Sequence, residues 1–280
     1  WARRTASAVL FLALAGGGAL GTGAAAWAST SASTTTPTPT STTPAPTATT
    51  PAPTSTTTPP TSGGTTTTPT PAPAPKPWAP TWRTTLRPGM KGTAVKAAQK
   101  RLQQLGYWVG KADGHYGTLT AQAVLAVQKS HRMKRTGVLD AATRKAITVG
   151  LRPKARTTSG SAIEVDLKRQ IGIVVSKGRT RWVLNTSTGN GKVYYQAGRR
   201  EVAVTPKGRF RIQRQIDGLR VSALGELWRP KYFYRGYALH GSPSIPAYPA
   251  SHGCVRLSNS AMNWLWSSGH APIGRKVWIY

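Results

Sequence analysis

The sequence predicts a multidomain protein, in which a small all-α domain of three helices precedes a mainly-β sandwich with one helix. Three observations support this fold class. The chain has 280 residues, but a long Thr- and Pro-rich stretch in its N-terminal part has nothing to bury in a core. Apolar residues then recur with helical spacing up to about residue 149. From about residue 161 they alternate with polar ones, as in strands.

The first 28 residues have the composition of an export signal. Ala2-Arg3-Arg4 supplies a positive start, an apolar run follows from about Ala8, and Ala26-Trp27-Ala28 offers a small-x-small cleavage site. Because this stretch is nearly long enough to span a bilayer, an uncleaved membrane anchor is the alternative. No later segment is apolar enough to cross a membrane. We therefore expect an exported protein with no stable membrane insertion after cleavage.

Residues 29–83 are expected to form a disordered linker. From Ser29 to Pro77 almost every residue is Thr, Pro, Ala or Ser, with Gly63, Gly64 and Lys76 as the exceptions. Such a tract cannot offset its ordering entropy, and its prolines favour an extended chain. The composition is also typical of O-glycosylated stalks.

The charge balance predicts a polyanionic partner. The chain carries 38 Lys and Arg against 7 Asp and Glu, for a net charge of +31. An exported chain does not normally meet nucleic acid, and the basic motifs of nucleic-acid-binding folds are absent, so we expect no nucleic-acid partner. An anionic envelope polymer is more consistent with export. The alternative is that the charges are only a solvated surface.

Residues 84–150 are predicted to be a compact helical domain. Its first helix begins near Thr93, and its apolar face consists of Val95, Ala98, Leu102 and Leu105. A second helix follows the turn at 113–117, and Asp140 is the N-cap candidate of a third helix that ends near Val149.

After a linker at 151–160, residues 161–280 are predicted to be a mainly-β domain. Ile163, Val165 and Leu167 alternate with polar residues, as in a half-buried strand. The other expected elements are a strand over 171–175, a turn and strand over 205–212, a helix over 258–267 and a final strand over 277–279. Short strands with a single helix favour a sandwich or barrel-like sheet.

The only cysteine, Cys254, lies in the segment Ser251-His252-Gly253-Cys254-Val255-Arg256, and His240-Gly241 precedes it by a short loop. A lone cysteine in an exported chain cannot form an internal disulfide. A free cysteine is often just a small buried hydrophobe. Packing alone, however, does not require the flanking His-Gly and Val-Arg, so this pattern favours a cysteine acyl-transfer site.

The flanking residues suggest roles in that chemistry. A thiol attacks a carbonyl only as a thiolate, so it needs a base, and either His240 or His252 is placed to serve. The amides of Gly253 and Cys254 are candidate oxyanion donors. Arg256 can pair with a carboxylate near the scissile bond, or form a surface ion pair. We expect no metal or cofactor, because no set of residues has the spacing of metal ligands.

The helical segment resembles the three-helix peptidoglycan-binding domain of wall-modifying enzymes. The matching residues are Leu86-Arg87-Pro88-Gly89, Val95, Gln99, Leu102, Leu105-Gly106-Tyr107, Asp113-Gly114-His115-Tyr116-Gly117, Thr120, Ala123-Val124 and Gln128. The one departure is Val127, where the family usually has Phe. The resemblance implies that this domain binds the glycan-peptide polymer and has no chemistry of its own.

Residues from about Ile163 to Ile279 resemble the L,D-transpeptidase catalytic domain. The resemblance rests on Thr205-Pro206-x-Gly208-x-Phe210, the aromatic run Lys231-Tyr232-Phe233-Tyr234, Leu239-His240-Gly241 and the segment from Ser251 to Arg256. It implies that Cys254 is the nucleophile, His240 the base and the Gly241 carbonyl its orienting group. The residues implied to shape the oxyanion and substrate pocket are Ser251, His252, Gly253 and Arg256. The loop between His240 and Ser251, with Pro243, Pro246 and Pro249, is shorter than in many members.

The family's reaction sets the functional expectation. Its members take an acyl group from a tetrapeptide stem of peptidoglycan, release the terminal D-alanine, pass the acyl group to an amine of a neighbouring stem, and are acylated by carbapenems. We therefore expect a peptidoglycan L,D-transpeptidase of the cell wall, active in cell wall organisation and cell shape, with peptidoglycan and anionic wall polymers as partners. The alternatives are an L,D-carboxypeptidase on the same stems, a non-catalytic wall-binding protein and a secreted polyanion binder.

Overall fold

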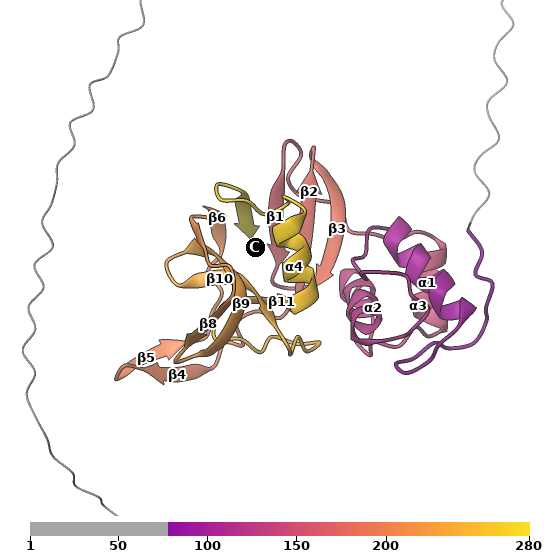
Figure 1. Ribbon diagram of the computed structural model, residues 1–280, viewed down its shortest axis with the longest axis horizontal. Helices are drawn as coiled ribbons and strands as arrows, with labels where there is room; N and C mark the ends of the chain where they lie inside the picture. Colours follow the sequence, from indigo (N-terminus) through magenta and orange to yellow (C-terminus); the bar gives the residue numbers. More distant parts are fainter. Residues whose placement is uncertain (1–77) are drawn as a thin grey trace, which may run out of the picture. The chain divides into compact units, whose positions relative to one another are not determined.

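The computed structural model describes residues 78–280, so the predicted export signal and most of the predicted linker lie outside the described residues. The elements in chain order (Figure 1) are α1 (Thr93–Gln104), α2 (Thr118–Ser130), α3 (Ala141–Thr148), β1 (Ala162–Asp166), β2 (Ile171–Ser176), β3 (Arg179–Asn185), β4 (Val193–Gln196), β5 (Arg199–Val202), β6 (Gly208–Arg211), β7 (Arg214–Gln215), β8 (Leu219–Ser222), β9 (Gly225–Tyr234), β10 (Tyr237–Ser242), β11 (Val255–Ser258), α4 (Asn259–Ser267) and β12 (Lys276–Ile279). Three helices followed by a mainly-β domain with one helix confirm the predicted fold class.

Buried side chains fix the ends and loops of the helical domain. Asp140 caps α3 as predicted, because its carboxylate accepts a hydrogen bond from Thr143 N at 2.8 Å. Gln99 on α1 is buried, and its side-chain amide holds the loop at residues 113–114 by two hydrogen bonds. It donates to the Asp113 carboxylate and accepts from Gly114 N. The buried side-chain amide of Gln99 thus has partners for both its oxygen and its nitrogen. None of the helices within residues 78–280 has the length and apolar character that crossing a bilayer demands.

Two tryptophans of the predicted linker pack on the helical domain. Trp82 is buried in the same apolar cluster as Leu86 and Leu102, and Trp78 packs against it with its ring 5.7 Å from that of Trp82. The guanidinium of Arg101 lies over the Trp78 ring. Indole side chains bury enough area to offset their ordering, unlike the Thr and Pro residues that precede them. The packed helical domain therefore begins before residue 84.

The mainly-β domain is built from two five-stranded sheets and a hairpin. One sheet has the order β3-β2-β1-β12-β6; in the other, β11-β10-β9-β7, strand β8 also pairs with β9. The hairpin is β4-β5. The apolar core between the sheets draws Ile163 and Val277 from the first, Phe233 and Leu239 from the second, and Met262 from α4. This arrangement is a sandwich, in which α4 follows β11 directly (Figure 1).

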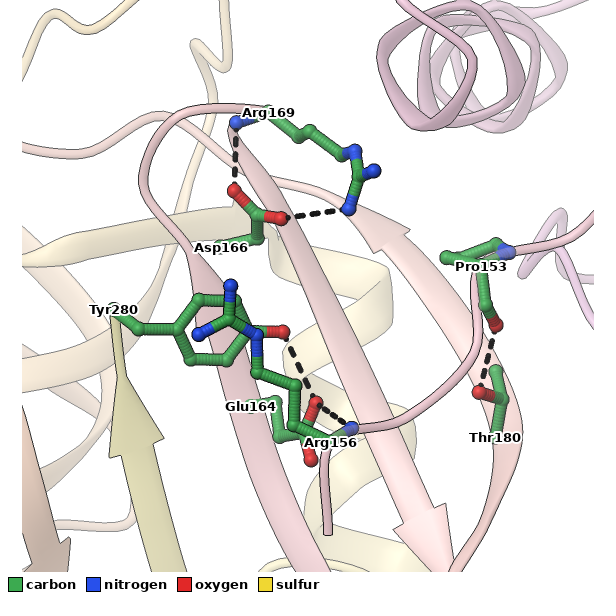
Figure 2. Close-up of polar contacts among 7 residues, drawn as sticks. All are labelled: Pro153, Arg156, Glu164, Asp166, Arg169, Thr180 and Tyr280. Carbon is green, nitrogen blue, oxygen red and sulfur yellow. Dashed lines mark hydrogen bonds and ion pairs between the residues drawn. The ribbon is translucent and has the colours of Figure 1, made fainter.

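Strand β1 does not alternate between buried and exposed residues as its pattern predicts. All five of its residues are buried, because both faces of the sheet are covered: Ile163 and Val165 face the core between the sheets, and Ala162 belongs to the apolar cluster of the helical domain. Glu164 is fully buried, and its carboxylate accepts hydrogen bonds from Arg156 N at 3.1 Å and Tyr280 Oη at 3.1 Å (Figure 2). It also accepts one from Thr157 N at 2.6 Å. These bonds hold the predicted linker 151–160 against the sheet.

The helical domain packs on the first sheet through continuous apolar contact. Tyr107 of the helical domain and Val183 of β3 are both fully buried and form a parallel bridge. Trp108 N donates to Val183 O at 3.0 Å, and Val183 N donates to Gly106 O at 2.7 Å. Ile171 and Ile173 of β2 belong to the same apolar cluster as the helices. The two domains therefore share one apolar cluster, whose buried members run from Trp82 to Val183.

Replacing Glu164 tests the link between residues 151–160 and the sheet. Glu164→Ala leaves two amides and a hydroxyl buried without an acceptor, so we expect the free energy of unfolding to fall by about 3 kcal/mol. Urea denaturation of the full chain measures this loss. Glu201→Ala on exposed β5 is the matched control and is expected to cost less than ~0.5 kcal/mol. Equal losses in the two variants would contradict the role assigned to Glu164.

Candidate active site

A cavity of about 540 Å³ brings together five of the residues that the sequence singled out. These are His240, Ser251, His252, Cys254 and Arg256. Its other walls come from the hairpin β4-β5 and from β8 and β9, which lie near one another in Figure 1. The size is typical of a pocket for a small-molecule or peptide ligand.

Parallel pairing of β10 with β11 positions the reacting groups. The pairing aligns Leu239 with Val255 and His240 with Arg256. Side chains alternate between the two faces along each strand, and residues aligned across neighbouring strands point to the same face. His240 and Arg256 therefore lie on one face of this sheet. Cys254, two residues before Arg256, lines the same cavity as both of them. Residues far apart in the sequence thus meet at one edge of the pocket.

The ring of His240 is held in one tautomer. Its Nδ1 lies 2.9 Å from Gly241 O, and since a carbonyl can only accept, Nδ1 carries the proton and Nε2 is an acceptor. The ring is 5 % exposed. Burial lowers the pKa of His240 to about 4; the Gly241 contact raises it and Arg256 lowers it, and burial prevails. His240 is therefore a neutral base at physiological pH.

The thiol of Cys254 is also held in its neutral form. Its side chain is partly exposed towards the cavity, and Sγ lies 3.8 Å from Gly236 O. Burial raises the pKa of Cys254, while a hydrogen bond to the Ala238 backbone and the charge of Arg256 lower it less strongly. A raised thiol pKa beside a lowered imidazole pKa favours a neutral pair over a thiolate–imidazolium pair.

Ser251 and Thr205 shape the backbone around the thiol. Ser251 Oγ donates to Cys254 O at 2.6 Å and accepts from Gly253 N at 3.0 Å. Thr205 Oγ1 donates to Gly253 O at 2.7 Å. Because Ser251 occupies the Gly253 amide, the amide of Cys254 is the stronger oxyanion candidate of the two that the sequence suggested.

Two glycines lie where no side chain can be accommodated. Gly253 has φ +135°, and a Cβ there would lie 2.5 Å from Tyr237 Cε1 and 2.9 Å from Val204 O. A Cβ on Gly241 would lie 2.7 Å from Asn259 Oδ1 and 2.9 Å from Trp228 Cδ1. Glycine at these positions lets the backbone on both sides of the cavity edge approach its neighbours closely.

The second histidine is placed differently from the first. The His252 ring packs edge-on against Tyr194 of β4, with ring centroids 4.8 Å apart. Its ring nitrogens make no hydrogen bond within the described part of the chain. The sequence left either histidine open as the base. The fixed tautomer of His240 favours His240, and His252 forms a wall of the cavity instead.

Sequence reasoning missed several residues of the cavity wall. Tyr194, Glu201, Glu226 and Tyr237 line it, and none belongs to a recognisable motif. The two glutamates are informative, because the whole chain has only 7 acidic residues. The scarcity of acidic residues was the one signal in the sequence that could have singled out these two glutamates. The described residues hold no cluster of three or more His, Cys, Asp or Glu suited to a metal ion.

Comparison with protein families matches two segments of the chain. Residues 91–147 match a peptidoglycan binding domain, and residues 160–279 match the L,D-transpeptidase catalytic domain. The chain is also 40 % identical over 80 residues to the N-acetylmuramoyl-L-alanine amidase CwlL of Bacillus licheniformis. That match covers 28 % of this chain and 22 % of the amidase, so the chain spans about a fifth of that relative's length.

A solved structure matches across both domains. The L,D-transpeptidase (residues 123–326) from Xylanimonas cellulosilytica is 50 % identical to this chain, with a TM-score of 0.68. The match covers 69 % of this chain and 96 % of that one. Half of the aligned residues are shared over nearly the whole of that structure, and the cavity holds the histidine and cysteine of the family's motif. The chain therefore belongs to the L,D-transpeptidase family, with a peptidoglycan-binding domain ahead of its catalytic domain.

Proposed function

We propose that this protein is a peptidoglycan L,D-transpeptidase that works through an acyl-enzyme on Cys254. The observation that carries the proposal is the position of the two reacting groups. His240, with Nε2 left as an acceptor by its bond to Gly241 O, lines the same cavity as Cys254 in a chain of this family. A base with a free acceptor nitrogen in the same cavity as a thiol supports the proposal, because nucleophilic catalysis by a thiol needs such a base.

The neutral pair defines how the proton moves. As Sγ of Cys254 attacks the stem carbonyl, Nε2 of His240 takes the thiol proton, and the Cys254 amide stabilises the developing oxyanion. His240 then returns the proton to the amine of the departing D-alanine, which leaves a thioester on Cys254. The acceptor amine attacks that thioester, His240 takes the amine's proton, and the thiol is restored.

Charged residues in the cavity fit the charged ends of the two stems. Arg256, which is half-buried, can pair with the carboxylate of the departing D-alanine. Glu201 and Glu226 can pair with an ammonium group on the donor's diamino acid or on the acceptor. We therefore place the carboxylate end of the donor at β11 and the amine-bearing groups towards β5 and β9.

The proposed substrate lies outside the cytoplasmic membrane, so we place the protein in the cell wall. The peptidoglycan-binding domain would hold the catalytic domain on its polymer and raise the local concentration of stems. In this setting the reaction contributes to cell wall organisation and cell shape.

Substitutions at the two reacting groups test the chemistry. Cys254→Ala should abolish the covalent adduct that a carbapenem or a stem peptide forms with the protein, as measured by intact mass. His240→Asn should slow adduct formation by at least about 100-fold, because the base is lost. The matched change His252→Asn should slow it much less. A retained adduct in Cys254→Ala would end the proposal.

The products decide between transfer and hydrolysis. A transpeptidase incubated with tetrapeptide muropeptides yields cross-linked dimers and free D-alanine, whereas a carboxypeptidase yields only trimmed monomers. We expect dimers, because Glu201 and Glu226 provide partners for an acceptor ammonium. Chromatography with mass detection separates the two product sets. Trimmed monomers alone would move the assignment to the carboxypeptidase.

The pH dependence of acylation tests the neutral pair. Since burial lowers the pKa of His240 to about 4, the base stays unprotonated well below its ordinary value of 6.5. The acylation rate should therefore remain nearly constant from pH 8 down to about 5.5 and fall by half only near pH 4. Rapid-quench mass measurement of the carbapenem adduct across this range gives the profile. A half-maximal rate between pH 6 and 7 would contradict it.

We also propose that anionic wall polymers bind a second hollow of the catalytic domain. This cavity, of about 620 Å³, is lined by Arg156, Arg209, Arg211 and Lys276 and by no carboxylate. Arg209 lies over the Trp278 ring, which holds its guanidinium at the rim. Phosphate groups along a polymer would meet several of these cations at once.

Retention on wall material tests this second site. Replacing Arg209 and Arg211 together with Gln should weaken binding to walls that carry phosphate polymers, and leave binding to stripped peptidoglycan unchanged. The matched control replaces Arg199 and Arg200 of exposed β5 with Gln, which removes the same charge elsewhere. Pull-down at two salt concentrations measures both. Equal losses in the two variants would show that only net charge matters.

A further inference from the structure

The loop between β10 and Ser251 is in contact with the active site at both ends and with the helical domain along its middle. Pro243 and Ser251, at its two ends, line the catalytic cavity. Between them, three consecutive backbone carbonyls accept hydrogen bonds from side chains of the peptidoglycan-binding domain. The bonds are Gln122 Nε2 to Ile245 O at 3.2 Å, Lys129 Nζ to Pro246 O at 3.4 Å and Arg135 Nη1 to Ala247 O at 3.0 Å.

Lys129 is the central member of this set. It is 0 % exposed, and its ammonium also donates to Thr186 O at 2.8 Å, just after β3. Neither of the two ion pairs found in residues 78–280 involves it. A buried ammonium that is solvated only by carbonyls costs more to bury than an apolar side chain of the same size. Its presence is therefore explained by the positions it imposes on two loop segments rather than by stability.

The segment after β3 connects these contacts to the nucleophile. Ser187 forms an antiparallel bridge with Arg256, with Arg256 N donating to Ser187 O at 2.9 Å. Ser251 N donates to Thr188 O at 2.9 Å, and Ser251 Oγ in turn donates to Cys254 O at 2.6 Å. A shift of this segment would therefore move the backbone on both sides of the thiol.

Gln122 reinforces the same junction from α2. Its side-chain oxygen accepts from Asn185 Nδ2, and Asn185 Nδ2 also donates to Ile245 O at 3.4 Å. The loop and the segment after β3 are thus joined to each other and to α2 by the same few polar atoms. The bond from Asn185 to Ile245 O is buried and those made by Gln122 are partly buried, and a hydrogen bond shielded from water is stronger than one in solvent.

We propose that Gln122, Lys129 and Arg135 are positioning residues for acyl transfer, so that the peptidoglycan-binding domain is a working part of the active site and not only a tether. The inference rests on the proposed function. Its physical basis is that the helical domain fixes residues 245–247, and thereby Ser251 and the Cys254 backbone, in the geometry needed for attack.

The test compares three variants of the full chain. Arg135→Met removes one contact of a partly exposed side chain, Lys129→Met removes two buried contacts, and Arg132→Met is the matched control. The side chain of Arg132 makes no hydrogen bond in the described part of the chain, although it lies between the other two in sequence. Carbapenem acylation of Cys254 should slow about 5-fold in the first variant and at least about 10-fold in the second. It should change less than 2-fold in the control.

Three further readouts separate positioning from folding. Iodoacetamide, which needs a reachable thiol but no shaped pocket, should label Cys254 in all variants within 2-fold of the wild-type rate. Binding to purified sacculi should stay unchanged. Amide hydrogen exchange over 243–251 should rise in Arg135→Met and Lys129→Met and not in β1 or β2. Arg135→Lys, which restores a cationic donor, should recover at least half of the lost rate.

The outcomes distinguish this inference from the proposed function. If the wild-type chain forms no adduct, the proposed function fails, and unchanged hydrogen exchange over 243–251 would then overturn the positioning role as well. If the wild type is acylated and Lys129→Met and Arg135→Met react at its rate, the inference is wrong and the proposed function stands. Equal loss of acylation and iodoacetamide labelling in both variants would also overturn it, because the residues would then only hold the fold.

Discussion

The short parallel pairing of β10 with β11 is the constraint on which the site depends. It spans only the residues from Leu239 to Ser242 and from Val255 to Ser258. Parallel strands need a long connection. Here that connection includes the loop whose Pro246 carbonyl accepts a hydrogen bond from Lys129 of the helical domain. The pairing therefore places His240 beside Arg256. It also requires the connecting loop, whose position affects the site. The geometry of the site therefore depends both on the strand pairing in the catalytic domain and on the contacts that the helical domain makes with the connecting loop.

Burial sets the electrostatics on both sides of this pairing. His240 and Cys254 are both kept neutral by desolvation, so the two groups do not form an ion pair. Lys129 illustrates the same force in a supporting role, since burial and the nearby Arg135 lower its pKa to about 7. Backbone carbonyls rather than carboxylates surround it. In this chain, which has few acidic residues, the dipoles of backbone carbonyls take the place of carboxylates as partners of this buried amino group.

The sequence predicted the helical domain well because local rules decide its helices. The cap at Asp140 and the apolar face of α1 follow from spacing alone. The motif around Cys254 and the histidine on β10 indicated the chemistry, and the structure brings them into one cavity. The tautomer of His240 was not deducible from composition or spacing, because it depends on one carbonyl in three dimensions.

Other features could not be predicted because they arise from tertiary packing. The alternation in β1 indicated a half-buried strand, but neighbours on both sides bury Glu164 as well. Strands β4 and β5 are short and mostly exposed, so no periodic signal marked the cavity wall that holds Tyr194 and Glu201. Nothing in the sequence distinguished Lys129 from the many other basic residues. Only the docking of α2 on the end of β3 reveals it as buried.

The two crowded glycines restrict how the sequence of this site can vary. Any side chain at Gly241 or Gly253 would collide with neighbouring ring, backbone or side-chain atoms, so these two positions next to pocket residues are closed to substitution. The hairpin β4-β5 and the strand β8 carry side chains that are largely exposed and free to vary. Sequence variation that leaves the backbone around Cys254 and His240 intact is therefore concentrated at the rim of the pocket.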